Sequence, residues 1–592
     1  MVKKIFDILE SKHKKYFFTL VLFFFPLIFL ETIGISSLPA FVVFITEQKN
    51  FDEYLRLFAI KDIIENLSLI QKTVYGSIII GIIFFIKGLV SLIIAYFEVG
   101  LVKNINVDIS SKIFKNYLDK EYYFHVQNNP AKLLQNTSED VRRAAGIIFT
   151  LLTIIKEMML ILVVIIIFIY ADPELFFLIF VTLSLPLFLF YLFFKKILKN
   201  RGDIAKKFRI ISLKIINQAF AGIKFIKLIK NEHSISKTLK RNLDISFKHE
   251  MFMNFLSKIP KVFLEILSIS VILILIIFYI SSGYTLNSFL PMITFIVVAT
   301  VRLIPSFGNI VNALNFMKFN SVSLNNVHET LRKKYSRLKF NKKNYKLNTK
   351  KRKYDKDLII KNLDFKYPEK KDKIIDNLSI RLKKNKTIGI TGASGSGKTT
   401  FVDLILNLLK PIDGSISFDG KNILEDEKKW MSGIGYVPQD VYLLDDTILN
   451  NIIFGHEEES IDKHFLNKCI QFSELSSFVK SLPKKLNTNI GHGGKKISGG
   501  QLQRIGIARA LYQNPKILIF DEATNALDIT TEVKIIKNLK KFSKDLTVIL
   551  ISHRFSVLKK CDEILLIENG KIKFKGEFKN LQKKMKVTNL KI

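Results

Sequence analysis

Cysteine and tryptophan are almost absent from this chain: its 592 residues include two cysteines, Cys469 and Cys561, and one tryptophan. Two thiols so far apart provide neither a disulfide framework nor a metal site, and they are typical of a reducing cytosol. Acidic residues are also scarce, with 52 Asp and Glu against 90 Lys and Arg, so the formal net charge is +38. Such a charge suggests nucleic acid as a partner. However, the lysines are spread along the chain without an aromatic-interleaved basic patch, so we expect no nucleic-acid partner.

Charge is missing from long stretches of the first half of the chain. Up to about residue 317, runs rich in Ile, Leu and Phe dominate, and a helix needs about 20 apolar residues to cross the hydrocarbon core of a bilayer. We predict six spanning helices, at residues 16–45, 74–102, 147–170, 175–194, 255–281 and 286–317. The first run follows Lys3 and Lys4 as in a signal peptide, but it is far longer than a signal-peptide core, so we expect it to be retained.

The loops between these segments differ sharply in charge. Residues 103–146 and 195–254 are crowded with Lys and Arg, whereas residues 46–73, 171–174 and 282–285 carry few. By the positive-inside rule, the crowded loops and both termini are cytoplasmic. The sequence therefore predicts a multi-pass protein of the cell inner membrane.

The two cytoplasmic loops are long enough to extend pairs of helices beyond the bilayer. Their tips, near Tyr122–Asn129 and Phe220–Glu232, combine apolar and basic residues that suit a groove on a soluble domain. On the external side, apolar residues repeat at helical spacing through residues 51–67. This repeat predicts either an amphipathic helix on the outer membrane surface or a small helix packed on the transmembrane domain, and the sequence leaves both open.

The second half of the chain has the composition of a soluble protein. A lysine-rich linker at 331–356 follows the transmembrane domain at 1–330. Short β-rich segments and then alternating strand and helix patterns fill residues 357–592. The predicted fold class is multidomain: an all-α six-helix transmembrane domain and an α/β nucleotide-binding domain with an antiparallel β subdomain.

The strongest motif is a glycine-rich loop that follows an apolar strand and opens a helix, as a P-loop does. It reads Gly392-Ala393-Ser394-Gly395-Ser396-Gly397-Lys398-Thr399, with Thr400 next. Glycines let backbone N–H groups surround phosphates, and the helix N-terminus adds positive potential. We expect Lys398 to reach the β- and γ-phosphates of ATP and Thr399 to ligate Mg²⁺.

A second apolar strand, at 517–520, ends in two carboxylates, Asp521 and Glu522. The first is placed to hold the Mg²⁺ shell and the second to polarise the attacking water. This pair is a weak signal alone, but together with the P-loop it predicts an ATP-hydrolysing site that uses Mg²⁺.

Between these motifs lies Ile497-Ser498-Gly499-Gly500-Gln501, and here the chain resembles the ATP-binding-cassette (ABC) family. The resemblance implies that Ser498, Gly499, Gly500 and Gln501 contact ATP, although Ile497 replaces the usual Leu. It further implies that Tyr367 stacks on adenine, that Gln439 senses Mg²⁺, that Asp528 lies in the loop between two ATPase domains, and that His553 contacts the γ-phosphate. His492 stands where the family has an acidic residue, which leaves the role of its loop open.

The resemblance also implies a dimer, because in this family the signature of one domain closes over the P-loop of another. The chain has one copy of each motif and six predicted spans. Glu522 and His553 are both present, so a homodimer accounts for the sequence, and a heterodimer stays open.

The cargo has to be inferred from charges in the membrane half, because charged residues inside a bilayer are costly and face a cavity or a partner. Lys87 and Arg302 lie near the midpoints of two spans, and Lys261 lies in the cytoplasmic half of a third. If they converge, they form a site for a strongly anionic group such as a pyrophosphate. The alternatives are that Lys261 snorkels to the interface and that Lys87 pairs with Glu31 or Glu157.

Three stretches of the membrane half resemble the PglK-type bacterial flippases of lipid-linked oligosaccharides. They are Phe29-Leu30-Glu31-Thr32, Lys224-Phe225-Ile226-Lys227-Leu228 and Arg302-Leu303-Ile304-Pro305-Ser306. This resemblance implies export of a polyprenyl-pyrophosphate-linked oligosaccharide to the outer leaflet for protein N-glycosylation. Another anionic lipid of the lipid A type, a drug or a peptide remain alternative cargoes. An ATP-gated channel or regulator, and a soluble-type ATPase tethered to the membrane, are alternatives of other classes.

Overall fold

A computed structural model describes residues 1–46, 68–171, 173–281, 286–332, 357–491, 494 and 496–588. The chain forms two compact units. The first comprises Met1–Lys120 and His125–Leu338, and the second comprises Glu121–Phe124 and Lys339–Ile592. The predicted external helix at 51–67, linker residues 333–356 and His492 lie outside the described residues.

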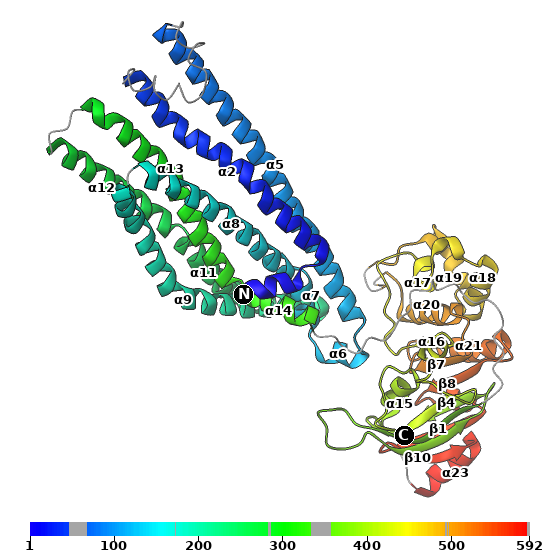
Figure 1. The fold of residues 1–592 in the computed structure, drawn as a ribbon. Coiled ribbons are helices and arrows are strands. Elements are labelled where there is room, and N and C mark those ends of the chain that lie inside the picture. Colours follow the sequence, from blue (N-terminus) through cyan, green and yellow to red (C-terminus); the bar gives the residue numbers. More distant parts are fainter. Residues whose placement is uncertain are drawn as a thin grey trace. The chain divides into compact units, whose positions relative to one another are not determined.

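Each predicted span falls on a long helix of the first unit (Figure 1). These helices are α2 (Ser11–Thr46), α5 (Leu69–Leu118), α8 (Glu139–Ala171), α9 (Pro173–Ala221), α12 (Ile259–Ser281) and α13 (Leu286–Phe319). By length and composition, three stretches of the described residues suffice to cross a membrane: Ser11–Val42, Thr73–Leu118 and Pro130–Ile167. Helices α5, α8 and α9 run well past the predicted spans, because the helical pattern continues into the Lys- and Arg-rich loops, whereas α12 begins at Ile259, inside the predicted span 255–281.

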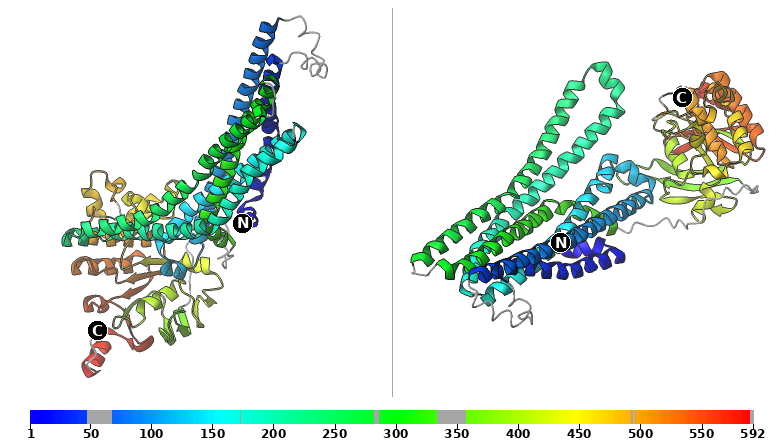
Figure 2. Two further views of the ribbon diagram at one scale, coloured as in Figure 1. Left: turned by 90° about the vertical axis from the view of Figure 1, so that its left-hand side faces the viewer. Right: turned by 90° about the horizontal axis from the view of Figure 1, so that it is seen from above.

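The predicted cytoplasmic tips fall on short helices. The first is α6 (Tyr122–Gln127), which precedes α7 (Pro130–Thr137), and the second is α10 (Ile223–Ile229). Helix α10 joins α9 to α11 (Glu232–Leu256), and these two lie side by side over much of their length (Figure 2). Apolar side chains of α10 remain largely exposed in the single chain, among them Phe225, Leu228 and Ile229.

A buried ion pair joins three helices of the first unit in the Lys- and Arg-rich part that the sequence predicts to be cytoplasmic. The fully buried carboxylate of Asp140 on α8 accepts hydrogen bonds from Lys206 Nζ on α9 at 2.5 Å and from Ser323 Oγ at 2.9 Å. Ser323 belongs to α14 (Ser321–Arg332), which also contacts the N-terminal helix α1 (Val2–Ile8). Asp140 thus connects α8, α9 and α14, and removing one partner of the ion pair would leave an uncompensated buried charge.

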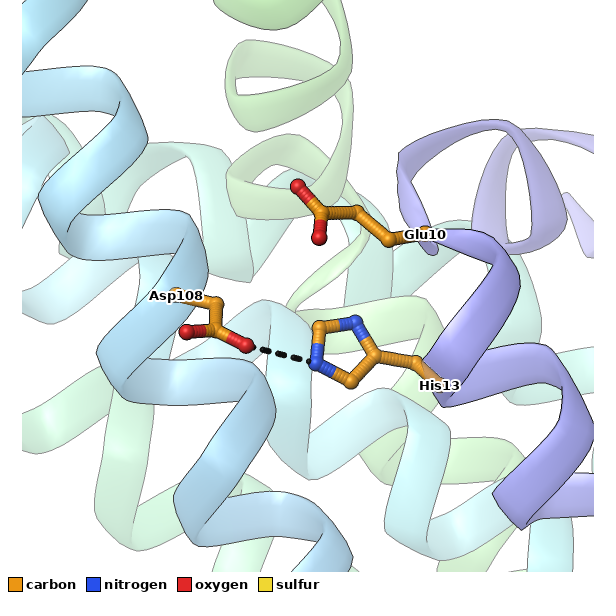
Figure 3. Close-up of side chains that lie close together, drawn as sticks. All are labelled: Glu10, His13 and Asp108. Atoms are coloured by element: carbon orange, nitrogen blue, oxygen red, sulfur yellow. Dashed lines mark hydrogen bonds and ion pairs between the residues drawn. The ribbon is translucent and has the colours of Figure 1, made fainter.

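A second polar cluster lies where α2 begins (Figure 3). His13 on α2 points toward Asp108 on α5, with 2.9 Å between Nε2 and Oδ2, and Glu10 lies in the turn before α2. The spacing of these three side chains is that of a metal site. However, Lys12 Nζ lies 2.5 Å from Asp108 and Lys112 Nζ lies 3.2 Å from Glu10. Lysines neutralise both carboxylates, so we interpret the cluster as an ion-pair network that ties α2 to α5.

The second unit contains two sheets in its described part. A six-stranded sheet has the order β10-β9-β3-β8-β7-β6, and a four-stranded antiparallel sheet has the order β2-β1-β4-β5. The bounds are β1 Leu358–Phe365, β2 Ile375–Leu382, β3 Thr387–Thr391, β4 Asp413–Phe418, β5 Lys421–Asn422, β6 Ile434–Val437, β7 Ile517–Asp521, β8 Thr547–Ile551, β9 Glu563–Glu568 and β10 Lys571–Gly576. This arrangement confirms the predicted α/β domain with an antiparallel β subdomain.

The centre of the larger sheet is parallel and buried. Strands β3, β7 and β8 are buried along their whole length, which accounts for their uninterrupted apolar sequences. Strand β8 pairs in parallel with both β3 and β7. The carboxyl ends of these strands therefore meet at one edge, where open α/β sheets bind ligands.

Candidate nucleotide-binding site

The P-loop lies between β3 and α15 (Lys398–Ile405), at that edge. Gly392 has φ +149°, and a Cβ there would lie 2.1 Å from the carbonyl oxygen of Ile567. Gly397 caps α15 with φ +99°. Both positions therefore require glycine. Ser394, Gly395 and Thr399 are exposed, so the loop backbone and the Thr399 hydroxyl are accessible to a nucleotide, whereas Thr400 is buried.

The Lys398 side chain turns back over the loop. Its ammonium donates hydrogen bonds to the carbonyl oxygens of Gly392 at 2.8 Å and Ala393 at 2.9 Å. Burial lowers the pKa of Lys398, and the carboxylates of Glu522 and Asp521 oppose that shift. A buried ammonium that donates to two carbonyl oxygens can exchange these contacts for stronger ones to phosphate oxygens.

Asp521 ends β7 and is buried at the same edge. Burial raises its pKa, while the Tyr436 hydroxyl, which donates to Oδ2 at 3.4 Å, opposes that rise. Burial, together with the charge of Asp521, raises the pKa of neighbouring Asp403 to about 6. A cation bound at Asp521 would relieve this crowding of acidic groups, so the oxygen donors present fit the Mg²⁺ that the sequence predicts.

Glu522 follows in a left-handed conformation, with φ +50°. This conformation is uncommon for a residue other than glycine and points to a constraint on the side-chain direction. Glu522 Oε1 lies 3.2 Å from His553 Nε2, and Oε2 accepts a hydrogen bond from the Asn525 side chain at 3.3 Å. The structure thus brings together the two predicted catalytic residues Glu522 and His553, which are 31 positions apart in the numbering.

The signature residues open helix α20 (Gly499–Tyr512). Ser498 caps it: its Oγ accepts from the backbone N–H of Gln501 at 3.3 Å, and the Gln501 side chain accepts from the N–H of Ser498 at 2.8 Å. This capping box satisfies two free helix donors. Ser498 and Gly499 nevertheless remain exposed, as does Asp528, which caps α21 (Ile529–Phe542).

Two residues of this region were missed by sequence reasoning. Gln503 on α20 accepts a hydrogen bond from the backbone N–H of Ala526 at 3.1 Å and so links the signature helix to the 525–528 loop. Arg554 pairs with the fully buried Glu532 at 3.2 Å and donates to carbonyl oxygens of the same loop, including that of Asn525 at 2.7 Å. The sequence offers one indication of a role for Arg554, its position directly after the predicted site residue His553.

Two further predicted residues, Gln439 and Tyr367, differ in their surroundings. Gln439 follows β6 and is exposed. Tyr367 packs edge-on against Phe365, with ring centroids 5.1 Å apart, and stacks at 5.9 Å on Tyr123 of the Glu121–Phe124 segment that belongs to this unit. The structure thus presents Tyr367 as an aromatic ring beside the β subdomain, with Tyr123 from the predicted tip Tyr122–Asn129 as its stacking partner.

The predicted cargo residues lie in the first unit. Lys87 on α5 and Arg302 on α13 both contact Glu31 on α2, at 3.0 and 2.5 Å. Lys261 instead lies 3.8 Å from Glu265 on its own helix and is exposed. Two of the three cations therefore converge, and they do so around a carboxylate.

Long apolar helices and a P-loop site at the parallel centre of a sheet define the class: a membrane protein with its own ATP-binding domain. Two family models agree, the ABC transporter transmembrane region over residues 17–303 and the ABC transporter domain over residues 375–525. The chain belongs to the ABC transporter family and has the domain arrangement of a half-transporter, with one transmembrane region followed by one ATP-binding domain.

Similar proteins carry names that refer to different cargoes. The chain is 40% identical over 226 residues to the alpha-hemolysin translocation ATP-binding protein HlyB of Escherichia coli, across 38% of this chain and 32% of that protein. It is 37% identical over 227 residues to the ATP-dependent lipid A-core flippase of Cupriavidus pinatubonensis, across 38% of each. The chain thus matches about a third of the length of these relatives.

The fold is also that of a solved exporter. The structure of a bacterial Atm1-family ABC exporter with ATP bound superposes with a TM-score of 0.78 over 96% of both chains. Sequence identity is 18%, so this likeness concerns the fold.

Proposed function

We propose that two copies of this chain bind two ATP molecules, each between the P-loop of one copy and the signature of the other. The exposure of Ser498, Gly499 and Asp528 supports this, because these residues remain accessible to a nucleotide or a second copy. The apolar side chains of α10 that are exposed in the single chain also favour a dimer, because a second copy could cover them.

Within each ATP site, we assign Glu522 as the base that activates water and His553 as the residue that orients its carboxylate. Their 3.2 Å contact supports these roles. Lys398 neutralises phosphate charge, and Thr399, Gln439 and Asp521 supply the oxygen atoms that would hold Mg²⁺. When bound, Mg²⁺ neutralises charge on the β- and γ-phosphates.

The proposed cargo is an anionic lipid that moves from the inner to the outer leaflet of the cell inner membrane. The observation that carries this proposal is the convergence of Lys87 and Arg302 among α2, α5 and α13. Cations placed inside a helical bundle mark a substrate path or its counter-ion. With the sequence resemblance to PglK-type flippases, a polyprenyl-pyrophosphate-linked oligosaccharide for protein N-glycosylation is the first candidate.

A lipid A-type anionic lipid is the second candidate, favoured by the similarity to the lipid A-core flippase. The similarity to HlyB makes a polypeptide the alternative cargo. The test is ATP hydrolysis by the full chain in proteoliposomes, with each cargo class added in turn. We expect polyprenyl-pyrophosphate-linked oligosaccharide to stimulate hydrolysis and to be flipped, and a zwitterionic phospholipid to do neither.

Stimulation by peptide alone would overturn the anionic-lipid proposal. Flipping that continues when Glu522→Gln has abolished hydrolysis would instead favour an ATP-gated pathway over a pump. Coupled pumping requires that the two states of the dimer differ in their affinity for ATP, because a ligand with equal affinity for both states shifts nothing.

A further inference from the structure

We propose that Glu31 is a built-in counter-ion: it occupies the anion position between Lys87 and Arg302 while no cargo is bound, and the anionic group of the cargo takes its place. This inference rests on the proposed export of an anionic lipid. It makes Glu31 a residue that determines which headgroups enter the path.

The contacts of Glu31 are electrostatic and poorly directed. A single oxygen, Oε1, lies 3.0 Å from Lys87 Nζ and 2.5 Å from Arg302 Nε. Neither Glu31 Oε1 nor Arg302 Nε makes a hydrogen bond within the described part of the chain. The interaction therefore depends on charge and proximity rather than on a fixed hydrogen-bond geometry, so another anion can take the position of the carboxylate.

The three side chains differ in exposure. The Glu31 side chain is 5% exposed, whereas those of Lys87 and Arg302 are 23% and 33% exposed. The carboxylate is thus enclosed behind the cations, and Lys87 also contacts the ring of Phe84 at 5.1 Å. An approaching anion therefore meets both cations before it meets the carboxylate.

Charge balance explains why such a group is needed. A transport path must be empty for part of each cycle, and two unpaired cations near the middle of a helical bundle would then be costly. Glu31 satisfies them and leaves the cluster with one net positive charge. A pyrophosphate group, with at least two negative charges, outcompetes one carboxylate, whereas a zwitterionic headgroup gains nothing from the exchange.

The exchange also changes which helices are tied together. Glu31 belongs to α2, and its two partners belong to α5 and α13, both of which pack against α2 (Figure 1). Transfer of Lys87 and Arg302 to the cargo releases α2 from both of these ion pairs. Cargo binding thereby acquires a direct effect on helix packing.

The experiment measures how inorganic pyrophosphate raises the thermal midpoint of the full chain in detergent, followed by helical circular dichroism. All proteins carry Lys398→Ala, because pyrophosphate also resembles the phosphates of ATP. We expect Glu31→Gln to reach half of its maximal stabilisation at about one tenth of the concentration that the parent needs, since the competing charge is gone. Adding Lys87→Gln and Arg302→Gln should abolish the response.

The matched control is Glu98→Gln, because Glu98 is equally buried and lies 3.5 Å from Lys156. It should leave the half-point where the parent has it. The counter-ion inference would be overturned if Glu31→Gln and the parent needed the same pyrophosphate concentration for half-maximal stabilisation. It would also be overturned if Glu98→Gln lowered that concentration as much as Glu31→Gln does. Should Glu31→Gln fail to fold, Glu31→Asp keeps the charge at a longer distance and should shift the half-point less, in the same direction; no shift again overturns the inference.

Lipid-stimulated ATP hydrolysis separates this inference from the proposed function. If no anionic lipid stimulates the chain with intact Lys398, but pyrophosphate still distinguishes Glu31→Gln, the lipid proposal fails and the counter-ion stands. If anionic lipid stimulates hydrolysis but pyrophosphate does not distinguish the variants, the lipid proposal stands and the counter-ion inference fails.

Discussion

The two units of this protein place charge in opposite ways. In the ATPase unit, Lys398 opens the helix that follows one short buried strand, Asp521 and Glu522 stand at the end of another, and each belongs to a motif of a few consecutive residues. In the helical unit, Glu31, Lys87 and Arg302 come from three helices and meet only after the bundle has formed. Local backbone geometry creates the first site, and long-range packing creates the second. Substitutions should therefore act differently in the two units.

The largest effect is expected in the ATPase unit. Glu522→Gln removes the proposed base without changing side-chain size, so steady-state hydrolysis should fall by about 100-fold or more. ATP binding, measured with a fluorescent nucleotide, should persist. Glu568→Gln, at the end of β9 in the same sheet, is the control and should hydrolyse normally. Undiminished turnover of Glu522→Gln would remove Glu522 from the catalytic role.

Arg554→Ala should have the next largest effect. It leaves the fully buried Glu532 without its ion-pair partner, which costs about 3 kcal/mol or more. Trp430, the chain's one tryptophan, is buried in the ATPase unit and reports its unfolding by fluorescence in urea. The double variant Arg554→Met with Glu532→Leu should recover much of the loss. A single variant as stable as the parent would show that the arginine does not support the 525–528 loop.

In the helical unit, the combination Lys87→Gln and Arg302→Gln should separate transport from hydrolysis. We expect lipid flipping to slow by about tenfold or more, because two charge-assisted contacts to the cargo are lost, while basal hydrolysis stays within about twofold. Lys261→Gln, which removes an exposed cation, should change neither. Equal losses of basal hydrolysis and flipping would mean that the ion cluster acts through folding, and the contrast between the units would disappear.

The smallest effect concerns pH. The pKa of Asp403 is raised to about 6 in the folded protein, so between its ordinary pKa near 4 and this value the folded state binds more protons than the unfolded state. Stability therefore falls as pH rises through this window. Asp403→Asn should flatten that slope and stabilise the ATPase unit at pH 7.5 by about 1 to 2 kcal/mol, after a discount for partial exposure. Urea midpoints from Trp430 fluorescence at pH 4.5 and 7.5 measure this; an unchanged slope would contradict it.

Much of the ATP site could be predicted because its parts are local. A glycine at position 392 is required by its own φ and by the carbonyl of Ile567, and Ser498 caps the helix that it begins. Tertiary contacts such as Gln503 to Ala526 and Arg554 to Glu532 left no pattern in the sequence, since their partners lie 23 and 22 positions away. The predicted roles of Gln439 and Tyr367 stay predictions, as do the domain boundaries.

The sequence by itself determined that the chain has long apolar helices, a P-loop ATPase and a basic side, because helix length, glycine spacing and charge are properties of neighbouring residues. Only the tertiary structure decided that Lys87 and Arg302 share Glu31 while Lys261 stays with Glu265. The physical reason is that ion pairing inside a bundle depends on which faces of separate helices meet, and the packing of the whole apolar surface decides this.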